Sequence, residues 1–284
     1  MLLLGLVSIG LRAAGEERIR ERIAGVLELE RVWAGHPVGF CLLTDPPNQY
    51  AAYYDAERRM TVARRRLDSR EWITEKLPPR LGWDSHNYVT LALDVDGCLH
   101  LAGNMHVDPL VYFRTAVPGD IGTFERIETM VDASVERRVT YPRFLDGPDG
   151  ALLFRYRNGS SGRGNDRYNV YDPETRSWRA LIDGPLLDGR GRMNGYFSEP
   201  RPGPDGRFHM VGVWRDTPDA ATNHHPSYAR SSDLVHWERA DGTPIPVPMT
   251  LETIDVVEDV PPRQGLINGN CRLGFDTQER PVVS

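Results

Sequence analysis

The chain has 284 residues, which is enough for one large β domain or two ordinary ones. Its 40% hydrophobic and 26% charged residues are typical of a soluble globular protein and argue against a disordered or membrane-embedded one. A formal net charge of −6, with no basic arm or Lys/Arg stripe, argues against a nucleic-acid partner. The 27 Gly and 22 Pro residues, many of them in Asp-Gly turns, favour many short strands.

Residues 1–31 are predicted to form an N-terminal segment apart from the main domain. The opening "MLLLGLVSIGL" is too short to span a bilayer, so no membrane partner is expected. It fits the apolar part of a signal peptide followed by small residues at 13–15, but it lacks a preceding basic stretch. A short helix with "EERIRERIAGVLELE", or a misplaced start site, fits equally well. The residues therefore leave the localisation open.

From residue 32 to residue 284 the sequence repeats one pattern, in which strands around a Gly-centred turn lead to a polar strand that closes on an aromatic residue. Repeats of roughly 40–55 residues with about four strands each are typical of propeller blades, because a small sheet must stack on its neighbours to bury both faces. We predict an all-β fold, a single β-propeller of four-stranded antiparallel blades. The turns lie at 55–60, 94–100, 147–153, 203–209 and 276–282, and the closing aromatics are Trp72, Phe124, Trp178 and Trp237.

The cysteines Cys41, Cys98 and Cys271 are widely spaced and define no disulfide framework. We expect free thiols that act mainly as small apolar side chains.

Three stretches carry more polar residues than strands need. In the first, His86 and His106 fall at neighbouring strand ends and could face one cavity, whereas His100 between them is predicted to be structural. The second stretch contains "TYP" and "FRYRNG", and the third contains "NGYF" and "TNHH". The three stretches cover residues 82–106, residues 139–144 with 153–172, and residues 193–231.

Together these stretches resemble the BNR-repeat ulvan lyases, the β-propeller enzymes of polysaccharide lyase families 24 and 25, with family 25 the nearer. The similarity runs from about Val32 onward through "GWDSHN", "GNMH", "TYP.F", "F.YR.G.SG.GN" and "WRDTPDA.TNH". The ending "SSDLVHW" (231–237) is similar to the Asp-box turn of sialidase-type blades, without its usual Gly. The resemblance implies a ring of seven blades.

The resemblance also implies a reaction, the β-elimination of a uronic acid. Such a lyase removes the C5 proton and expels the O4-linked sugar, which requires a base, an acid and a cation beside the carboxylate. Carried over to this chain, His86 and His106 become the cleft histidines, Tyr141 the catalytic tyrosine and Arg157 the carboxylate partner. The scheme requires no cofactor. Each residue also has a structural interpretation, in strand packing or in a surface ion pair.

Further residues are candidates for substrate binding. Arg155 shares a strand side with Arg157 and is its alternative, and Tyr196 could stack on a sugar or belong to the core. Asn87 and Asn104 could bind sugar hydroxyls or hold turns.

A structural zinc site, of the kind found in some of these lyases, is a weaker inference from the resemblance. His209, His224 and Cys271 would be its ligands. The chain lacks a Cys near Ala220, where the pattern has one, and His225 could replace it. The alternative is a buried thiol and two ordinary histidines.

We therefore predict a polysaccharide lyase that acts on an acidic, uronate-containing glycan, sulfated or not, such as ulvan. Such a function favours secretion or a periplasmic location, and it needs a local basic cleft in an acidic protein. Two alternatives stay open: a non-catalytic glycan-binding propeller, and a sialidase-type hydrolase, although its arginine cluster cannot be placed in the sequence.

The repeats supply about five blades, the last of which begins at "GLINGNC" (265–271). The sequence stops within that blade, so we expect an incomplete ring and a truncated gene product. A closed ring in the structure would contradict this expectation.

Overall fold

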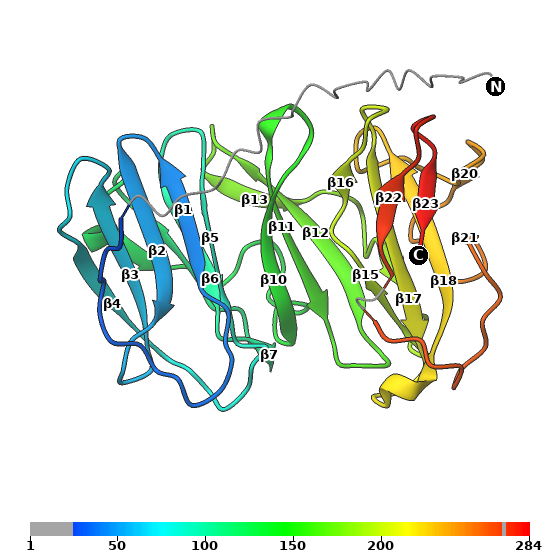
Figure 1. The fold of residues 1–284 in the computed structure, drawn as a ribbon, viewed down its shortest axis with the longest axis horizontal. Helices are drawn as coiled ribbons and strands as arrows, with labels where there is room; N and C mark the ends of the chain where they lie inside the picture. The colour runs from blue at the N-terminus through cyan, green and yellow to red at the C-terminus, as the bar shows by residue number, and fades with distance from the viewer. Residues whose placement is uncertain (1–24, 269–270) are drawn as a thin grey trace, which may run out of the picture.

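The computed structural model describes residues 25–268 and 271–284 (Figure 1). This part of the chain folds into β-strands joined by turns, with three single-turn 3-10 helices and no α-helix among the described residues. No helix in it has the length and apolar character needed to cross a bilayer. The N-terminal segment predicted over residues 1–31 lies mostly outside the described residues.

The first two blades are antiparallel four-stranded sheets in which the strands follow one another in order. Short turns, among them two-residue and Asp-Gly turns, connect consecutive strands. Gly97, for example, has a positive φ of 80°, a conformation that favours glycine. The first blade holds β1 (Cys41–Asp45), β2 (Asn48–Tyr54), β3 (Arg59–Arg66) and β4 (Ile73–Arg80), and the second β5 (Val89–Leu93), β6 (Leu99–Gly103), β8 (Tyr112–Thr115) and β9 (Phe124–Arg126).

The next two blades keep this plan and gain extra short strands at their edges. The third includes β7, which leaves the second blade in sequence and pairs with β10. The third blade holds β7 (His106–Asp108), β10 (Val139–Asp146), β11 (Leu152–Asn158), β12 (Asn165–Asp172), β13 (Ser177–Ala180) and β14 (Leu187–Asp188), and the fourth β15 (Asn194–Phe197), β16 (Arg201–Pro202), β17 (Phe208–Arg215), β18 (Asn223–Ser231), β19 (Trp237–Glu238), β20 (Pro244–Ile245) and β21 (Asp255–Val256).

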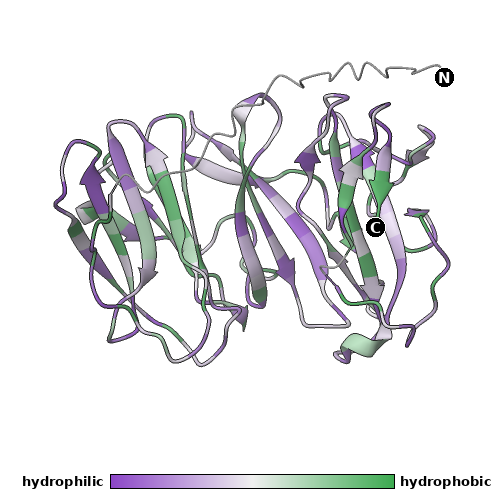
Figure 2. Cartoon of the chain, viewed as in Figure 1, coloured by the Kyte–Doolittle hydropathy of each residue, from purple (hydrophilic) through white to green (hydrophobic). Residues whose placement is uncertain are grey.

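The blades stack face to face, and each contact between two blades contains its own hydrophobic cluster. Met60 and Leu101 meet between the first and second blades, Tyr112 and Phe154 between the second and third. A further cluster joins the third and fourth blades around Trp214, which is fully buried. Figure 2 shows hydrophobic residues along β17, as expected for a strand covered on both faces.

Two of the predicted closing aromatics, Trp178 and Trp237, are buried in these clusters, and Phe124 packs against the cluster between the first two blades. Trp72 lies in a separate small cluster on the first blade. The aromatic at the end of each repeat therefore helps to seal a blade against its surroundings.

The described blades form an open arc rather than a closed ring (Figure 1). The last two strands, β22 (Leu273–Phe275) and β23 (Pro281–Val283), pair only with each other, and no described strand joins them to the first blade. The prediction of an all-β propeller with an incomplete ring is thus confirmed. The three cysteines are free, as predicted; Cys98 is buried and the other two are half-buried.

Candidate active site

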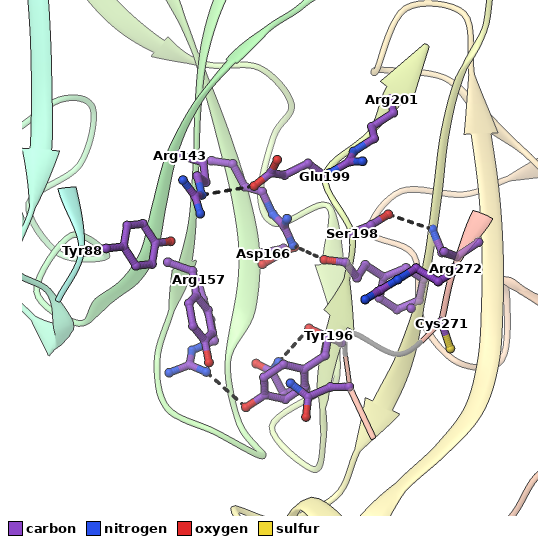
Figure 3. A pocket seen from close by; sticks show the side chains of 18 residues that line it. Tyr88, Arg143, Arg157, Asp166, Tyr196, Ser198, Glu199, Arg201, Cys271 and Arg272 are labelled. Carbon is purple, nitrogen blue, oxygen red and sulfur yellow. Dashed lines mark hydrogen bonds and ion pairs between the residues drawn. The ribbon is translucent and has the colours of Figure 1, made fainter. Parts of the chain in front are cut away.

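A polar cavity of about 470 Å³ lies between the third and fourth blades. Strands β10 and β11 form one wall and β15 with β17 the other, so residues distant in sequence face each other (Figure 3). Arginines outnumber acids in its lining, which makes it the local basic cleft that an acidic glycan would need. The charged residues are Arg143, Arg155, Arg157, Arg201 and Arg272 against Asp166 and Glu199.

A pair of stacked histidines lies next to this cavity. The rings of His86 and His106 are 4.2 Å apart between centroids, with an interplanar angle of 26°. Asp84 bridges them: its Oδ1 is 2.5 Å from Nδ1 of His86 and its Oδ2 is 2.5 Å from Nδ1 of His106. The ring of Tyr141 lies 5.6 Å from that of His86, which joins the pair to the cavity.

Tyr141 sits in a β-bulge of β10. The register with β11 shifts between Thr140 and Arg143, and Tyr141 adopts a φ of 58°, in the left-handed region. A non-glycine residue in that region costs on the order of 1–3 kcal/mol, and such strain gathers at functional sites. A bulge also redirects the side chain, here into the cavity. Burial raises the pKa of Tyr141, although the charge of Arg157 acts in the opposite direction.

Arg157 carries a buried cation that has no carboxylate partner among the described residues. Its side chain is on β11 and the residue is only 2% exposed. The guanidinium lies over the ring of Tyr141 at 4.8 Å, and Nη1 donates to the hydroxyl of Tyr196 at 3.2 Å (Figure 3). Within the described residues, its Nε and Nη2 have no hydrogen-bond partner. Because unpaired buried donors are costly, these two nitrogens are available for an anionic ligand.

Tyr196 links Arg157 to the far wall of the cavity. Its hydroxyl is 2.7 Å from Oγ of Ser161, and the guanidinium of Arg215 lies 4.2 Å from its ring centroid. Asn223 in turn holds Arg215, accepting from Nε at 2.8 Å. The ring of Tyr196 is therefore fixed by polar contacts on both sides, rather than buried in the core.

Three predicted substrate-binding residues either form hydrogen bonds within the protein or lie outside the cavity lining. Arg155 lines the cavity, but it donates to Asp166 at 2.6 Å and to the carbonyl of Phe197 at 2.9 Å. Asn104 holds a turn: its Oδ1 accepts from the N–H of Gly82, and its amide donates to the Arg80 carbonyl. Asn87 is buried outside the cavity lining.

His100 is fully buried, as the structural role predicted for it requires. It lies 3.2 Å from Asp94 and 2.7 Å from the hydroxyl of Tyr112.

The three candidate zinc ligands are not brought together. His209 lies on β17, and His224 lies on β18 opposite Trp214 of β17. His209 and Trp214 are five residues apart along β17, so the two histidines are separated by roughly 17 Å along the strand direction. His209 contacts Asp205 and Tyr228, and His224 contacts Asp216. Among the described residues, the one group of three with possible ligand atoms within 4.8 Å of one another is Asp84, His86 and His106.

The site also contains residues that the sequence prediction left out: Asp84, Arg143, Ser161 and Arg215. Asp84 and Ser161 fall inside the motifs "GWDSHN" and "SG.GN", so their positions were a usable signal. Arg143, which lies 3.3 Å from Glu199 and over the ring of Tyr88, follows "TYP" directly. Arg215 lies inside "WRDTPDA.TNH", which was likewise a signal, and the pairing of β15 with β17 within the fourth blade brings it to Tyr196.

Solved structures with this architecture include polysaccharide lyases. The polysaccharide lyase Uly1 is 17% identical, with a TM-score of 0.66 over 93% of this chain and 68% of that one. A family 25 ulvan lyase is 14% identical, with a TM-score of 0.59 over 90% of this chain and 64% of that one. Its complex with -[GlcA(1-4)Rha3S]- is also 14% identical and gives a TM-score of 0.62, covering 89% and 66%. At these identities the likeness shows the fold.

The chain spans about two thirds of the length of these lyases. No curated protein matches it. A family model described as "BNR repeat-containing family member" matches residues 48–284, which is most of the sequence and every described strand after β1. The chain therefore belongs to the BNR repeat-containing family.

Proposed function

We propose that this protein is a polysaccharide lyase that cleaves an acidic, uronate-containing glycan by β-elimination. The observation that carries the proposal is the buried guanidinium of Arg157, with two nitrogens that lack a partner in the described residues, packed against Tyr141. Tyr141 in turn touches the histidine pair. A cation for a carboxylate and groups for proton transfer thus lie side by side.

The reaction places a definite demand on each group. A base removes the C5 proton, the electron pair forms the C4–C5 double bond, and the bond from C4 to the bridging oxygen breaks. An acid returns a proton to that oxygen. Negative charge develops on the carboxylate beside C5, where a preorganised guanidinium stabilises it best.

The roles follow from the surroundings of each side chain. Because burial raises the pKa of Tyr141, its hydroxyl is protonated at neutral pH and suits the acid role. His86, whose side chain is 41% exposed beside Tyr141, suits the base. Arg157 binds the carboxylate, and Tyr196 offers a ring and a hydroxyl to the sugar.

The substrate class follows from the charge of the cavity and its size. Five arginines against two acids favour a polyanion, and about 470 Å³ accommodates a small number of sugar units. An ulvan-type glycan agrees with the -[GlcA(1-4)Rha3S]- fragment that is bound to the similar ulvan lyase.

The test is a screen of the purified full chain against ulvan, other uronate polymers and a neutral glycan. We expect ultraviolet absorbance from the unsaturated uronate with the acidic polymers alone. New reducing ends without that absorbance would identify a hydrolase, and binding without either product would identify a glycan-binding module. Both of these results would overturn the proposal.

A further inference from the structure

Asp84 divides its two carboxylate oxygens between the two histidine rings. Oδ1 faces Nδ1 of His86 and also accepts the His86 backbone N–H at 2.8 Å, while Oδ2 faces Nδ1 of His106. The stacked rings keep both Nδ1 atoms on the same side. Neither Nε2 has a hydrogen-bond partner in the part of the chain that the structure describes.

This geometry fixes where the ring protons lie. An ionised carboxylate only accepts hydrogen bonds, so each Nδ1 that faces it must carry a proton. A neutral imidazole carries one N–H, which leaves Nε2 of each ring as a bare acceptor. Burial acts against ionisation of Asp84, but its hydrogen bonds from the His86 backbone and from both rings hold its pKa well below the ordinary range.

We propose that Asp84 is a positioning residue that locks both His86 and His106 in the Nδ1–H tautomer, so that two adjacent Nε2 atoms act as proton acceptors beside Tyr141. Its catalytic consequence rests on the proposed lyase function, whereas the tautomers do not depend on it. The second acceptor gives the proton abstracted at C5 a neighbouring site, 4.2 Å away between ring centroids.

The same three side chains could instead hold a divalent metal ion. The two arrangements make opposite demands on Nδ1: a metal ligand has no proton on the coordinating nitrogen, whereas a hydrogen bond to Asp84 requires one. The protonation state of Nδ1 therefore distinguishes them.

The experiment is a nitrogen–proton correlation spectrum of the histidine rings in the ¹⁵N-labelled full chain. It is recorded as the pH is raised until the ring signals stop changing, so that the rings are neutral. His86→Gln and His106→Gln assign the two signals among the eight histidines. We expect both rings to show Nδ1–H and a bare Nε2 in the wild-type protein.

Asp84→Asn gives the sharpest result. The amide keeps the shape of the carboxylate but offers one acceptor and one donor, so one ring must keep Nδ1–H and the other must change to Nε2–H. In Asp84→Ala neither ring is fixed. Asp233→Asn, beside the exposed His236, is the matched control and should leave both rings unchanged.

On an active substrate, Asp84→Asn should lower kcat by about 100- to 10,000-fold while KM changes little, because one acceptor has the wrong tautomer. Nε2–H on either ring of the wild-type protein, unchanged tautomers in Asp84→Asn, or a stoichiometric metal by elemental analysis would each overturn the proposal. If the tautomers behave as expected but no polymer is cleaved, Asp84 keeps its role and the lyase function fails instead.

Discussion

Tyr141 points into the cavity because its backbone adopts a left-handed conformation, which non-glycine residues rarely adopt. Its left-handed φ of 58° and the bulge of β10 turn its side chain toward His86 and Arg157. Strain of this kind persists only where the surrounding structure enforces it. Here the paired strands β7 and β11 on both sides of β10 supply that constraint.

Tyr141→Phe should reduce turnover at least about 100-fold, because it removes the hydroxyl that donates the proton and leaves the ring contacts in place. The melting temperature should change little. Product absorbance and thermal unfolding check the two effects separately. Near-normal turnover in a folded variant would assign the acid role to another group.

Arg157→Met should separate activity from stability. The change removes a buried cation, two of whose nitrogens have no partner in the described part of the chain, so the free energy of unfolding should stay the same or rise by about 1 kcal/mol. Turnover should fall by about 100-fold or more, because the developing carboxylate charge loses its partner. Denaturant unfolding and product absorbance measure the two quantities. A strongly destabilised Arg157→Met protein would mean that the guanidinium is needed for folding instead.

Among the structural elements, the turn between β11 and β12 shapes the pocket around Arg157. A Cβ added at Gly164 would lie 2.6 Å from Cδ of Arg157 and would also collide with Asn194. Glycine is required there because the backbone passes directly against the arginine.

Gly164→Ala should therefore displace Arg157 and lower activity by about tenfold or more, since a small misplacement of a charge-stabilising group is costly. Gly274→Ala is the matched control, because a Cβ there meets no atom of the described residues within 4 Å. Equal activity of the two variants would show that Arg157 tolerates displacement.

The turn between β18 and β19 of the fourth blade supplies a pH dependence. Burial opposes ionisation of Asp233, but hydrogen bonds from His236, Val235 and Ser231 lower its pKa from 3.8 to about 2. A lowered pKa in the folded state adds stability that is complete above the ordinary value and is lost as the pH falls toward 2.

The free energy of unfolding should thus decline by about 1 kcal/mol from this group between pH 4 and about pH 2, allowing for its partly exposed side chain. Asp233→Asn should remove that part of the decline. Urea unfolding at several pH values measures it, and an unchanged slope in the variant would contradict the assignment.

In the molecule as a whole, a buried ion pair ties the third blade to the fourth. Arg155 bonds Asp166 within its own blade and the Phe197 carbonyl on the next. Arg155→Met should cost about 3–5 kcal/mol, because Asp166 is left buried without its cation. The double variant Arg155→Met/Asp166→Leu should recover much of that loss. Chemical denaturation checks both, and a neutral single variant would show that the pair adds nothing to the contact between blades.

The amino-acid sequence alone predicts the blades and most of the site. Regular turns and closing aromatics indicate the repeat, because each small sheet must bury both faces. The motifs single out His86, His106, Tyr141 and Arg157 as site residues, and these four side chains lie together in the structure. Strand alternation put Arg155 and Arg157 on one side but could not tell them apart. The folded chain distinguishes them. Arg155 donates to Asp166 and to the carbonyl of Phe197, whereas two nitrogens of Arg157 have no partner among the residues that the structure describes.

Contacts between neighbouring strands and between blades account for the rest. The link of Asp84 to His106 and the packing of Arg215 on Tyr196 join residues about 20 positions apart, so no local pattern reveals them. The same holds for the proposed zinc ligands: similar residue types along a chain do not meet unless the strand register brings them together, and here it places His209 and His224 at opposite ends of a strand pair. The spacing of residues in the sequence predicts which side of a strand they occupy. Their partners on other strands depend on the strand register and on how the blades stack.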